Sequence, residues 1–396
     1  FNYPTNDLQL IGVTGTNGKT TITYILEALF QAHQKKTGVI GTIQMKIGNE
    51  AYPTENTTPH ALALQETFSH MREADIDVCM MEVSSHALDL GRVFGCNFDL
   101  AIYTNLSQDH LDYHENMETY FHAKSLLFSQ LGNAYNPEQP KFGIINVDDS
   151  YAEKLQKATA QPIITYGIHQ KADVYATNIY FSNEATTYTL HTPIGSIAIE
   201  TPMIGSFNVY NMLAVASAGI VKGISLETIA STFATIQGVD GRFEQVVEGQ
   251  PFSVIVDYAH TPDSLENVLK TAKELAENRV CVVVGCGGDR DKTKRPLMAA
   301  IATQYADEAI FTSDNPRTED PQAILNDMTE GLTETNYTEV IDRKEAITFA
   351  VEKAEQNDII IIAGKGHETD QTIGKEKFEF DDRKVAAEAI RSLNRK

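Results

Sequence analysis

The chain has 396 residues, of which 42% are hydrophobic and 22% are charged, and this composition is typical of a globular protein with two or three domains. Its formal net charge of -22 argues against nucleic acid as a partner, because an acidic surface repels a phosphate backbone. No apolar run approaches the length of a membrane span and no signal peptide is visible, so we expect no membrane association.

The cysteines indicate the compartment. Cys79, Cys96, Cys281 and Cys286 form no CxxC pair and no zinc-binding spacing. Scattered thiols of this kind are typical of a reducing environment, so we expect a cytoplasmic protein. The chain begins with Phe1 in place of Met, and we expect that a further N-terminal piece precedes it.

The first part of the chain alternates short apolar runs with longer stretches of helical spacing. This alternation predicts a mostly parallel sheet covered by helices. Near residue 173 the pattern changes to short polar–apolar alternation, which predicts a small antiparallel section. We expect strands at 8–14, 78–83, 98–106 and 143–147, antiparallel strands within 173–204, and helices at 20–36 and 208–223.

A second α/β block begins near Gly241, so we expect one domain over residues 1–240 and another over residues 241–396. Its apolar runs are separated by stretches of helical spacing, and the pattern again predicts a parallel sheet. We expect strands at 252–258, 279–285, 308–313 and 358–364, with helices at 323–332 and 344–354 among the connections.

The strongest local signal is TGTNGKTT at residues 14–21, between a predicted strand and a predicted helix. Glycines let backbone amides surround a phosphate, and the helix N-terminus adds partial positive charge. Lys19 can reach the outer phosphates and Thr20 can bind Mg²⁺, so the segment is predicted to bind ATP. Val13 stands where the general P-loop pattern has glycine, and the alternative is an ordinary glycine-rich turn.

A second group of polar residues follows the next two predicted strands. Glu82 ends one strand, and TNLSQDHLDYH at 104–114 follows the other with Asn105, Asp109, His110, Asp112 and His114. Carboxylate and imidazole groups at strand ends suit a divalent metal that bridges to phosphate. Lys124 lies on an otherwise apolar helix, and from the residues alone a surface lysine with a buried stem is the simpler interpretation.

The second block also has a polar turn after each of four strands: DYAHTP at 257–262, GCGGDRDKTKRP at 285–296, SDNPR at 313–317 and AGKGHE at 363–368. One such turn would be unremarkable. Four turns at the same edge of one sheet predict a binding cleft, and the cluster of Arg290, Lys292, Lys294 and Arg295 beside glycines predicts an anion site.

These motifs, together with NTTP at 56–59, EVSSHAL at 82–88, AKSLLF at 123–128 and GRFE at 241–244, occur in one order, and in this respect the chain resembles the Mur ligase family. The resemblance covers essentially the whole chain and implies a P-loop central domain followed by a Rossmann-like C-terminal α/β domain. Family members carry a further N-terminal domain that binds UDP, and the chain resembles only the two domains after it.

The resemblance implies an ATP-dependent acid–amino-acid ligase of peptidoglycan precursor synthesis that works in the cytoplasm with Mg²⁺. The substrates it implies are UDP-N-acetylmuramoyl-L-alanyl-D-glutamate and meso-diaminopimelate, joined through an acyl phosphate. We expect a monomer. Arg317 favours diaminopimelate over L-lysine, because a guanidinium grips the second carboxylate of diaminopimelate and repels the ammonium of lysine.

The resemblance also assigns roles to residues. Lys19, Lys124 and His110 would be catalytic, Lys124 as a carbamate (N6-carboxylysine), and Thr20, Glu82, His110 and the Lys124 carbamate would hold the metal. ATP would be held by Gly15, Thr16, Asn17, Gly18, Lys19, Thr20, Thr21, Asn211, Arg242 and Asp257. The UDP-linked precursor would contact Asn56, Thr57, Thr58, Ser84 and Arg92, and diaminopimelate would contact Arg290, Asp314, Asn315, Pro316, Arg317, Gly364 and Glu368.

Asp370 departs from the family, whose members commonly carry an aromatic residue at this position. The alternatives are the same chemistry with L-lysine or another amino acid, an enzyme resembling folylpolyglutamate synthetase, or a nucleotide-dependent switch protein without ligase activity. The second cleft and Lys124 argue against the switch protein.

Overall fold

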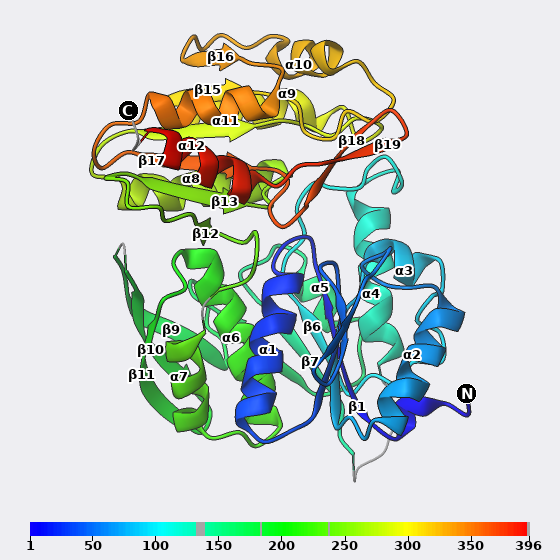
Figure 1. Ribbon diagram of the computed structural model, residues 1–396. Coiled ribbons are helices and arrows are strands. Elements are labelled where there is room, and N and C mark those ends of the chain that lie inside the picture. Colours follow the sequence, from blue (N-terminus) through cyan, green and yellow to red (C-terminus); the bar gives the residue numbers. More distant parts are fainter. Residues whose placement is uncertain (132–138, 183, 237, 394–396) are drawn as a thin grey trace. The chain divides into compact units, whose positions relative to one another are not determined.

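The structure is a computed structural model that describes residues 1–131, 139–182, 184–236 and 238–393 (Figure 1). It divides the chain into two compact units. Residues 1–107 and 114–237 form the first unit, and residues 108–113 and 238–396 form the second. The sequence predicts a simple division at residue 240, in which residues 108–113 stay with the first domain, and this division remains a prediction.

The first unit is built on one sheet, to which the described residues contribute eleven strands in the order β11-β10-β9-β8-β7-β6-β1-β5-β2-β3-β4. Pairing from β2 through β6 to β9 is parallel, and short antiparallel strands extend the sheet at both ends. The strands are β1 (Gln9–Thr14), β2 (Thr37–Ile40), β3 (Met45–Ile47), β4 (Glu50–Tyr52), β5 (Val78–Glu82), β6 (Leu100–Tyr103), β7 (Phe142–Asn146), β8 (Ile163–Gly167), β9 (Val174–Phe181), β10 (Thr186–Thr192) and β11 (Gly195–Thr201).

Helices cover both faces of this sheet, which is why its central strands are continuous apolar runs. Val78 and Met80 of β5 point into the core beneath α1, α6 and α7, whereas Cys79 and Met81 point into the core beneath α2 and α4. The helices are η1 (Pro4–Asn6, a 3₁₀ turn), α1 (Lys19–Ala32), α2 (Ala61–Glu73), α3 (Ser85–Asp89), α4 (Met117–Gln130), α5 (Ala152–Gln156), α6 (Ser206–Val221) and α7 (Leu226–Thr235).

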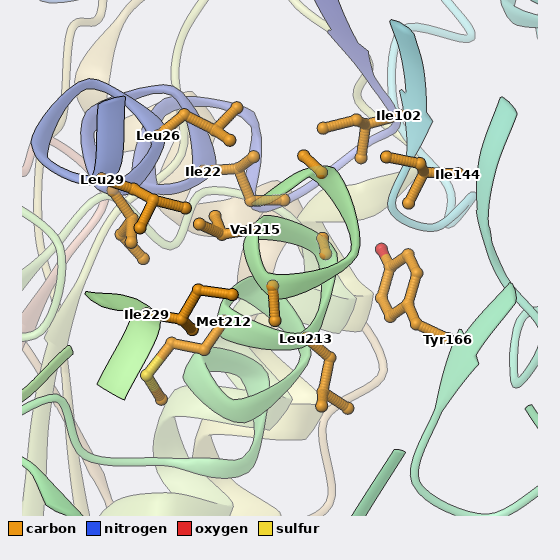
Figure 2. Close-up of a cluster of buried hydrophobic side chains, with 14 of the residues drawn as sticks. Ile22, Leu26, Leu29, Ile102, Ile144, Tyr166, Met212, Leu213, Val215 and Ile229 are labelled. Atoms are coloured by element: carbon orange, nitrogen blue, oxygen red, sulfur yellow. The ribbon is translucent and has the colours of Figure 1, made fainter. Parts of the chain in front are cut away.

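The packing of α1 on α6 forms the centre of the first core (Figure 2). Ile22, Leu26 and Leu29 recur at helical spacing on α1 and are wholly or almost wholly buried. They face Val215 of α6, as Figure 2 shows, while Ile102, Ile144 and Tyr166 approach α6 from β6, β7 and β8. This packing fixes α1 on the sheet, and with it the loop that joins β1 to α1.

The second unit contains a six-stranded sheet in the order β12-β13-β17-β14-β15-β16, parallel except at β12, and a two-stranded hairpin of β18 and β19, counted over the described residues. The strands are β12 (Glu244–Gln245), β13 (Ser253–Asp257), β14 (Val280–Val284), β15 (Glu308–Phe311), β16 (Tyr337–Glu339), β17 (Ile359–Ala363), β18 (Asp370–Ile373) and β19 (Glu376–Glu379). The helices are α8 (Pro262–Leu275), α9 (Lys294–Tyr305), α10 (Pro321–Thr329), α11 (Arg343–Glu352) and α12 (Asp382–Leu393).

The helices of the second unit are fixed by packing and by capping. Helices α11 and α12 pack on one face of the sheet through Ile347, Val351 and Ile390. Helix α8 starts at Thr261, whose side chain accepts a hydrogen bond from the Ser264 amide in a capping box, and Pro262 follows at the first helical position. The α/β architecture expected from the sequence is thus confirmed, antiparallel section included. In the part of the chain that the structure describes, no helix is both long enough and apolar enough to cross a membrane.

Candidate active site

The loop after β1 depends on two glycines. Gly15 and Gly18 have φ angles of 142° and 90°, a region that residues with a side chain rarely adopt. A Cβ on Gly15 would lie 1.8 Å from Oγ1 of Thr104, so the backbone approaches its neighbour too closely for any larger residue. Gly18 then caps α1, which begins at Lys19, so the N-terminal end of the helix lies at the loop. Val13, which stands where the general P-loop pattern has glycine, is buried within β1, before this loop.

Residues after β6 hold this loop in place. Thr104 Oγ1 donates to the Asn17 carbonyl at 2.6 Å, and the Asn17 amide donates to Oδ1 of Asn105 at 2.9 Å. The Lys19 ammonium folds back on the loop and donates to the carbonyls of Gly15 and Thr16 at 2.9 and 2.7 Å. The loop is therefore preorganised, with a cation at its centre, as anion binding requires.

The first unit also brings Asn211 to the loop. Asn211 lies on α6, and a Cβ on Gly18 would lie 2.6 Å from its Oδ1. Its amide nitrogen donates to Oδ1 of Asn208 at 3.2 Å, which orients the side chain. A residue almost 200 positions after the loop thus lies against it, as its predicted nucleotide-binding role requires.

Glu82, at the end of β5, is a buried carboxylate that contacts the first turn of α1. Its Oε2 accepts hydrogen bonds from Oγ1 of Thr20 at 3.0 Å and of Thr42 at 3.1 Å, and its Oε1 accepts one from the Thr42 amide at 2.8 Å. A Cβ on Gly41 would lie 2.4 Å from Oε1, so a larger residue there would displace the Glu82 carboxylate. A hydroxyl and a carboxylate held together are oxygen ligands of the kind that Mg²⁺ prefers.

The loop at 53–60 is tied to the start of α3. Oγ1 of Thr58 donates to the Glu82 carbonyl at 2.8 Å and accepts from the Ser84 amide at 3.0 Å. A guanidinium nitrogen of Arg92 donates to the Thr58 carbonyl at 3.0 Å, and Thr57 and Thr42 share a hydrogen bond at 3.0 Å. The residues predicted to contact the precursor, with Asn56 in the same loop, therefore come together beside Glu82.

Lys124 is buried, with 2% of its surface exposed. Its ammonium donates to the Gly15 carbonyl at 2.8 Å and lies 4.5 Å from the centre of the Tyr120 ring. The surface lysine favoured by the residues alone is therefore wrong, because the side chain turns inward from α4 to the P-loop. Tyr120 lies one helical turn earlier, and its hydroxyl shares a hydrogen bond with Oγ1 of Thr16 at 3.2 Å.

The segment 108–113 belongs to the second unit, and so does its predicted metal ligand His110. His110 and His260 lie 3.3 and 3.8 Å from Oδ2 of Asp109, and the Lys294 ammonium lies 3.8 Å from Oδ1. Burial alone would raise the pKa of the Asp109 carboxyl, but the electrostatic influence of His110, His260 and Lys294 holds that pKa well below its usual range. Asp109 therefore stays ionised beside the Lys294 ammonium and two imidazoles.

Two predicted nucleotide-binding residues lie next to each other in the second unit. The Asp257 carboxylate ends β13 and accepts a hydrogen bond from the Phe243 amide at 2.7 Å. Burial raises the pKa of Asp257 to about 6, although the Arg242 guanidinium opposes this shift. Arg242 lies 4.3 Å from the centre of the Tyr258 ring. A buried carboxylate with its charge partly uncompensated can accept hydrogen bonds from a ligand hydroxyl.

The glycine-rich turn after β14 and the DNPR turn after β15 pack directly against each other. A Cβ on Gly288 would lie 1.9 Å from the Pro316 carbonyl oxygen, so the turns meet through bare backbone. A guanidinium nitrogen of Arg317 donates to the Gly288 carbonyl at 2.7 Å. Burial, and then the charge of Arg290, lower the pKa of Arg317, so the two cations are close enough to interact.

Gly364 and Glu368 approach the same turn from β17. Gly364 has a φ of 114°, and a Cβ there would lie 2.7 Å from Oδ2 of Asp314. Oε2 of Glu368 accepts a hydrogen bond from the Asn315 side-chain amide at 2.8 Å. All the residues predicted to hold the incoming amino acid therefore meet at the carboxyl ends of β14, β15 and β17, where α/β sheets bind ligands.

Three residues that these contacts involve carry no sequence motif of their own. Thr42 lies in a short loop that contains no motif. For Tyr120, the only signal in the sequence is its position one helical turn before Lys124. Lys365 lies inside GKGHE, and its complete burial is unexpected for a lysine. No group of three or more His, Cys, Asp or Glu side chains placed to hold a metal ion occurs among the described residues.

A glycine-rich loop between β1 and α1 on a mostly parallel sheet, followed by a second α/β unit with charged turns at its strand ends, is the arrangement of a nucleotide-binding protein. Two family models match the chain: the Mur ligase middle domain over residues 13–219 and the Mur ligase glutamate ligase domain over residues 241–366. The chain belongs to the Mur ligase family.

Two curated relatives are each 58% identical to the chain, and both are named UDP-N-acetylmuramoyl-L-alanyl-D-glutamate–2,6-diaminopimelate ligase. The protein from Bacillus cereus aligns over 98% of this chain and 79% of its own length, and the protein from Oceanobacillus iheyensis over 99% and 80%. A solved structure of an enzyme with the same name is 39% identical with a TM-score of 0.68, covering 98% of this chain and 79% of its own. A MurF structure from Acinetobacter baumannii has a TM-score of 0.72 at 19% identity, covers 100% of this chain and 78% of its own, and shows the shared fold.

Proposed function

We propose that the protein is an ATP-dependent ligase that adds meso-diaminopimelate to UDP-N-acetylmuramoyl-L-alanyl-D-glutamate in peptidoglycan precursor synthesis. The observation that carries this proposal is the 58% identity to ligases of that name over 98% of the chain. The packed DNPR and GKGHE turns support it independently, because Arg317 and Glu368 lie within electrostatic reach of each other.

The proposed reaction has two steps. A carboxylate of the precursor attacks the γ-phosphorus of ATP, ADP leaves, and an acyl phosphate forms. The amine of diaminopimelate then attacks the acyl carbon, phosphate leaves, and the amide bond is complete. Because anions must approach each other in the first step, the loop amides and Lys19 contribute by stabilising negative charge.

Mg²⁺ would be held by Thr20 and Glu82, whose oxygen atoms are already joined by a hydrogen bond of 3.0 Å. A carbamate on Lys124 would add to the set that the family resemblance implies. When bound, the ion would supply positive charge to the phosphate oxygens. The amine of Lys124 lies at the Gly15 carbonyl, so a carbamate formed there would place its negative charge beside the P-loop.

The residues proposed to bind the incoming amino acid, which we call the acceptor pocket, explain why we favour diaminopimelate over L-lysine. They are Arg290, Asp314, Asn315, Pro316, Arg317, Gly364 and Glu368. The far end of diaminopimelate carries a carboxylate and an ammonium, whereas that of lysine carries only an ammonium. Arg317 presents a planar fork of donors that suits a carboxylate, and Glu368 can receive the ammonium. A lysine substrate would leave Arg317 without a counter-charge, which opposes its binding.

The test is amino-acid-dependent phosphate release by wild type and Arg317→Ala, with diaminopimelate and lysine side by side. Loss of a buried charge partner costs roughly 2–5 kcal/mol, so the KM for diaminopimelate should rise at least tenfold while the KM for ATP stays the same. Arg391→Ala is the matched control, because it removes an exposed guanidinium that pairs with Glu248. A wild type that prefers lysine would overturn the acceptor assignment, and a folded wild type without any amino-acid-dependent phosphate release would overturn the ligase.

We also propose that the protein acts in the cytoplasm. All four cysteines are free thiols in the structure, as expected for a protein of the reducing cytoplasm. A monomeric state and the absence of nucleic-acid partners remain predictions of the sequence.

A further inference from the structure

Lys365 is a lysine whose side chain has no exposed surface, in the turn between β17 and β18. Burial of an ammonium is costly unless every donor finds an acceptor. Its Nζ donates to Oδ1 of Asn315 at 3.1 Å, to Oε2 of Glu368 at 2.9 Å and to the Asp370 carbonyl at 2.6 Å. The three donors of the ammonium are therefore satisfied by three different partners, two of which belong to the proposed acceptor pocket.

These contacts fix the direction of the Glu368 carboxylate. Oε2 accepts from both Lys365 and the Asn315 side-chain amide, at 2.9 and 2.8 Å. The other oxygen, Oε1, has no hydrogen-bond partner within the part of the chain that the structure describes, and the side chain remains 30% exposed. Glu368 thus keeps one oxygen for a ligand while the other is anchored to the protein.

The same ammonium stabilises the backbone around Arg317. Its third acceptor, the Asp370 carbonyl, begins β18. Two residues further along, the Thr372 carbonyl accepts from the Arg317 amide at 3.1 Å, and the Gly374 amide donates to the Arg317 carbonyl at 2.7 Å. Arg317 has a φ of 50°, an uncommon conformation that this pairing with β18 maintains.

Asn315 joins the two halves of this arrangement. Its Oδ1 accepts from Lys365 and, at 2.9 Å, from the Thr372 amide, while its side-chain amide donates to Glu368. A polar network that anchors Oε2 of Glu368, the Asn315 side chain and the Lys365 ammonium holds these groups in one geometry. Loss of Lys365 would remove the charge that balances Glu368 and one anchor of the strand beside Arg317.

We propose that Lys365 is a positioning residue that sets the selectivity of the pocket for an amino acid with a zwitterionic far end. The inference rests on the proposed function, because it takes Arg317 and Glu368 as the groups that receive this end. Lys365 acts in two ways. First, it orients the Glu368 carboxylate and supports the backbone at Arg317. Second, it neutralises part of the Glu368 charge. A substrate such as lysine, whose far end has an ammonium but no carboxylate for Arg317, is then held too weakly to bind.

Lys365→Met is the sharpest test, because methionine fills similar space without donors or charge. The matched control is Lys377→Met on β19, which removes an exposed lysine that pairs with Asp370 at 3.0 Å in the same hairpin. Phosphate release by the full chain should be measured with diaminopimelate and with lysine, giving kcat and KM for each acceptor and the KM for ATP. Thermal melting should accompany every variant.

We expect Lys365→Met to raise the KM for diaminopimelate roughly 10- to 100-fold, the range typical of residues that orient a ligand-binding group, with kcat and the KM for ATP unchanged. The kcat/KM ratio of diaminopimelate to lysine should fall, because diaminopimelate loses the support of Arg317 while the Glu368 charge, no longer balanced by Lys365, attracts the lone ammonium of lysine more strongly. In a Glu368→Gln background the same substitution should have a smaller effect on this ratio, because the two residues act through one contact.

The opposite results would overturn the inference. They are unchanged diaminopimelate kinetics, or a parallel loss for both acceptors and for ATP, which is what a lysine needed only for folding would produce. If Lys365→Met shows no melting transition, Lys365→Gln, which retains donors without charge, is judged by the same criteria. A wild type that fails to use diaminopimelate would instead refute the proposed function, so the two failures are distinguishable.

Discussion

Asp257 is a buried carboxyl whose charge destabilises the folded protein. Its pKa is raised to about 6 by burial, whereas an unfolded aspartate titrates near about 3.9. The difference is about two pKa units, and each unit corresponds to about 1.4 kcal/mol, so the ionised form costs the fold roughly 3 kcal/mol. Asp257→Asn removes the charge, resembles the protonated carboxyl in shape, and retains an oxygen to accept from the Phe243 amide.

The sign of the effect depends on pH. Below pH 4 the carboxyl is protonated in both the folded and the unfolded state, so wild type and Asp257→Asn should be equally stable. Between about pH 4 and pH 6 the unfolded chain loses the proton while the folded chain keeps it, and the stability of the wild type falls. Above pH 7 the variant should therefore be more stable by the full roughly 3 kcal/mol.

Urea denaturation followed by circular dichroism at pH 4 and pH 8 measures this difference. Asp307→Asn is a control of opposite sign: burial would raise the pKa of Asp307, but its hydrogen bond with Lys273 lowers it, so this variant should lose stability at pH 8. Equal stability of wild type and Asp257→Asn at pH 8, or a gain of the same size at pH 4, would refute the reasoning. If Asp257 binds the nucleotide, the more stable variant should also have a higher KM for ATP, since the costly charge is retained for function.

Three further predictions follow from other contacts. Lys19→Ala should abolish ATP turnover and leave the circular dichroism spectrum unchanged, and phosphate release at the wild-type rate would contradict a phosphate-binding role. Lys124 should carry the added mass of CO₂ in intact-protein mass spectra under bicarbonate, and Lys124→Ala should lose activity that short carboxylates partly restore; an unmodified amine would argue against the carbamate. Asp382→Ala should lower the free energy of unfolding by roughly 3–5 kcal/mol in urea titrations, because it leaves the wholly buried Arg343 without its carboxylate partner at 2.7 Å; a smaller loss would mean that water reaches the guanidinium.

The main strands and the P-loop were predictable because their signals are local. A run such as 78–83 is apolar throughout, and only a strand buried on both faces, or a short piece of buried helix, has that pattern. Strands β3 and β4, with three residues each, and the polar hairpin of β18 and β19 were missed, because such short or polar segments show no periodicity.

The roles of side chains were less predictable than the elements that carry them. The inward direction of Lys124 follows from the packing of α4 on the sheet, and a mostly apolar helix does not reveal which way one long side chain turns. Thr42 binds Glu82 because β2 lies beside β5, which is a property of strand order. Asp370, the departure from the family pattern, pairs with Lys377 across the hairpin, a contact that no local rule indicated.

The strand order of the first unit also has a consequence for how the protein folds. Strand β1 lies between β5 and β6, and its pairs join Gln9 to Val78 and Ile11 to Leu100. Pairs so distant in sequence require the closure of long loops before any contact stabilises them, and parallel sheets of this kind form slowly. The Gly15–Thr104 approach can exist only after β6 has docked, so the P-loop should be among the last features to form. Nascent chains would then be unable to bind ATP until the centre of the sheet is complete, and ATP, once bound, would favour that completed state by mass action.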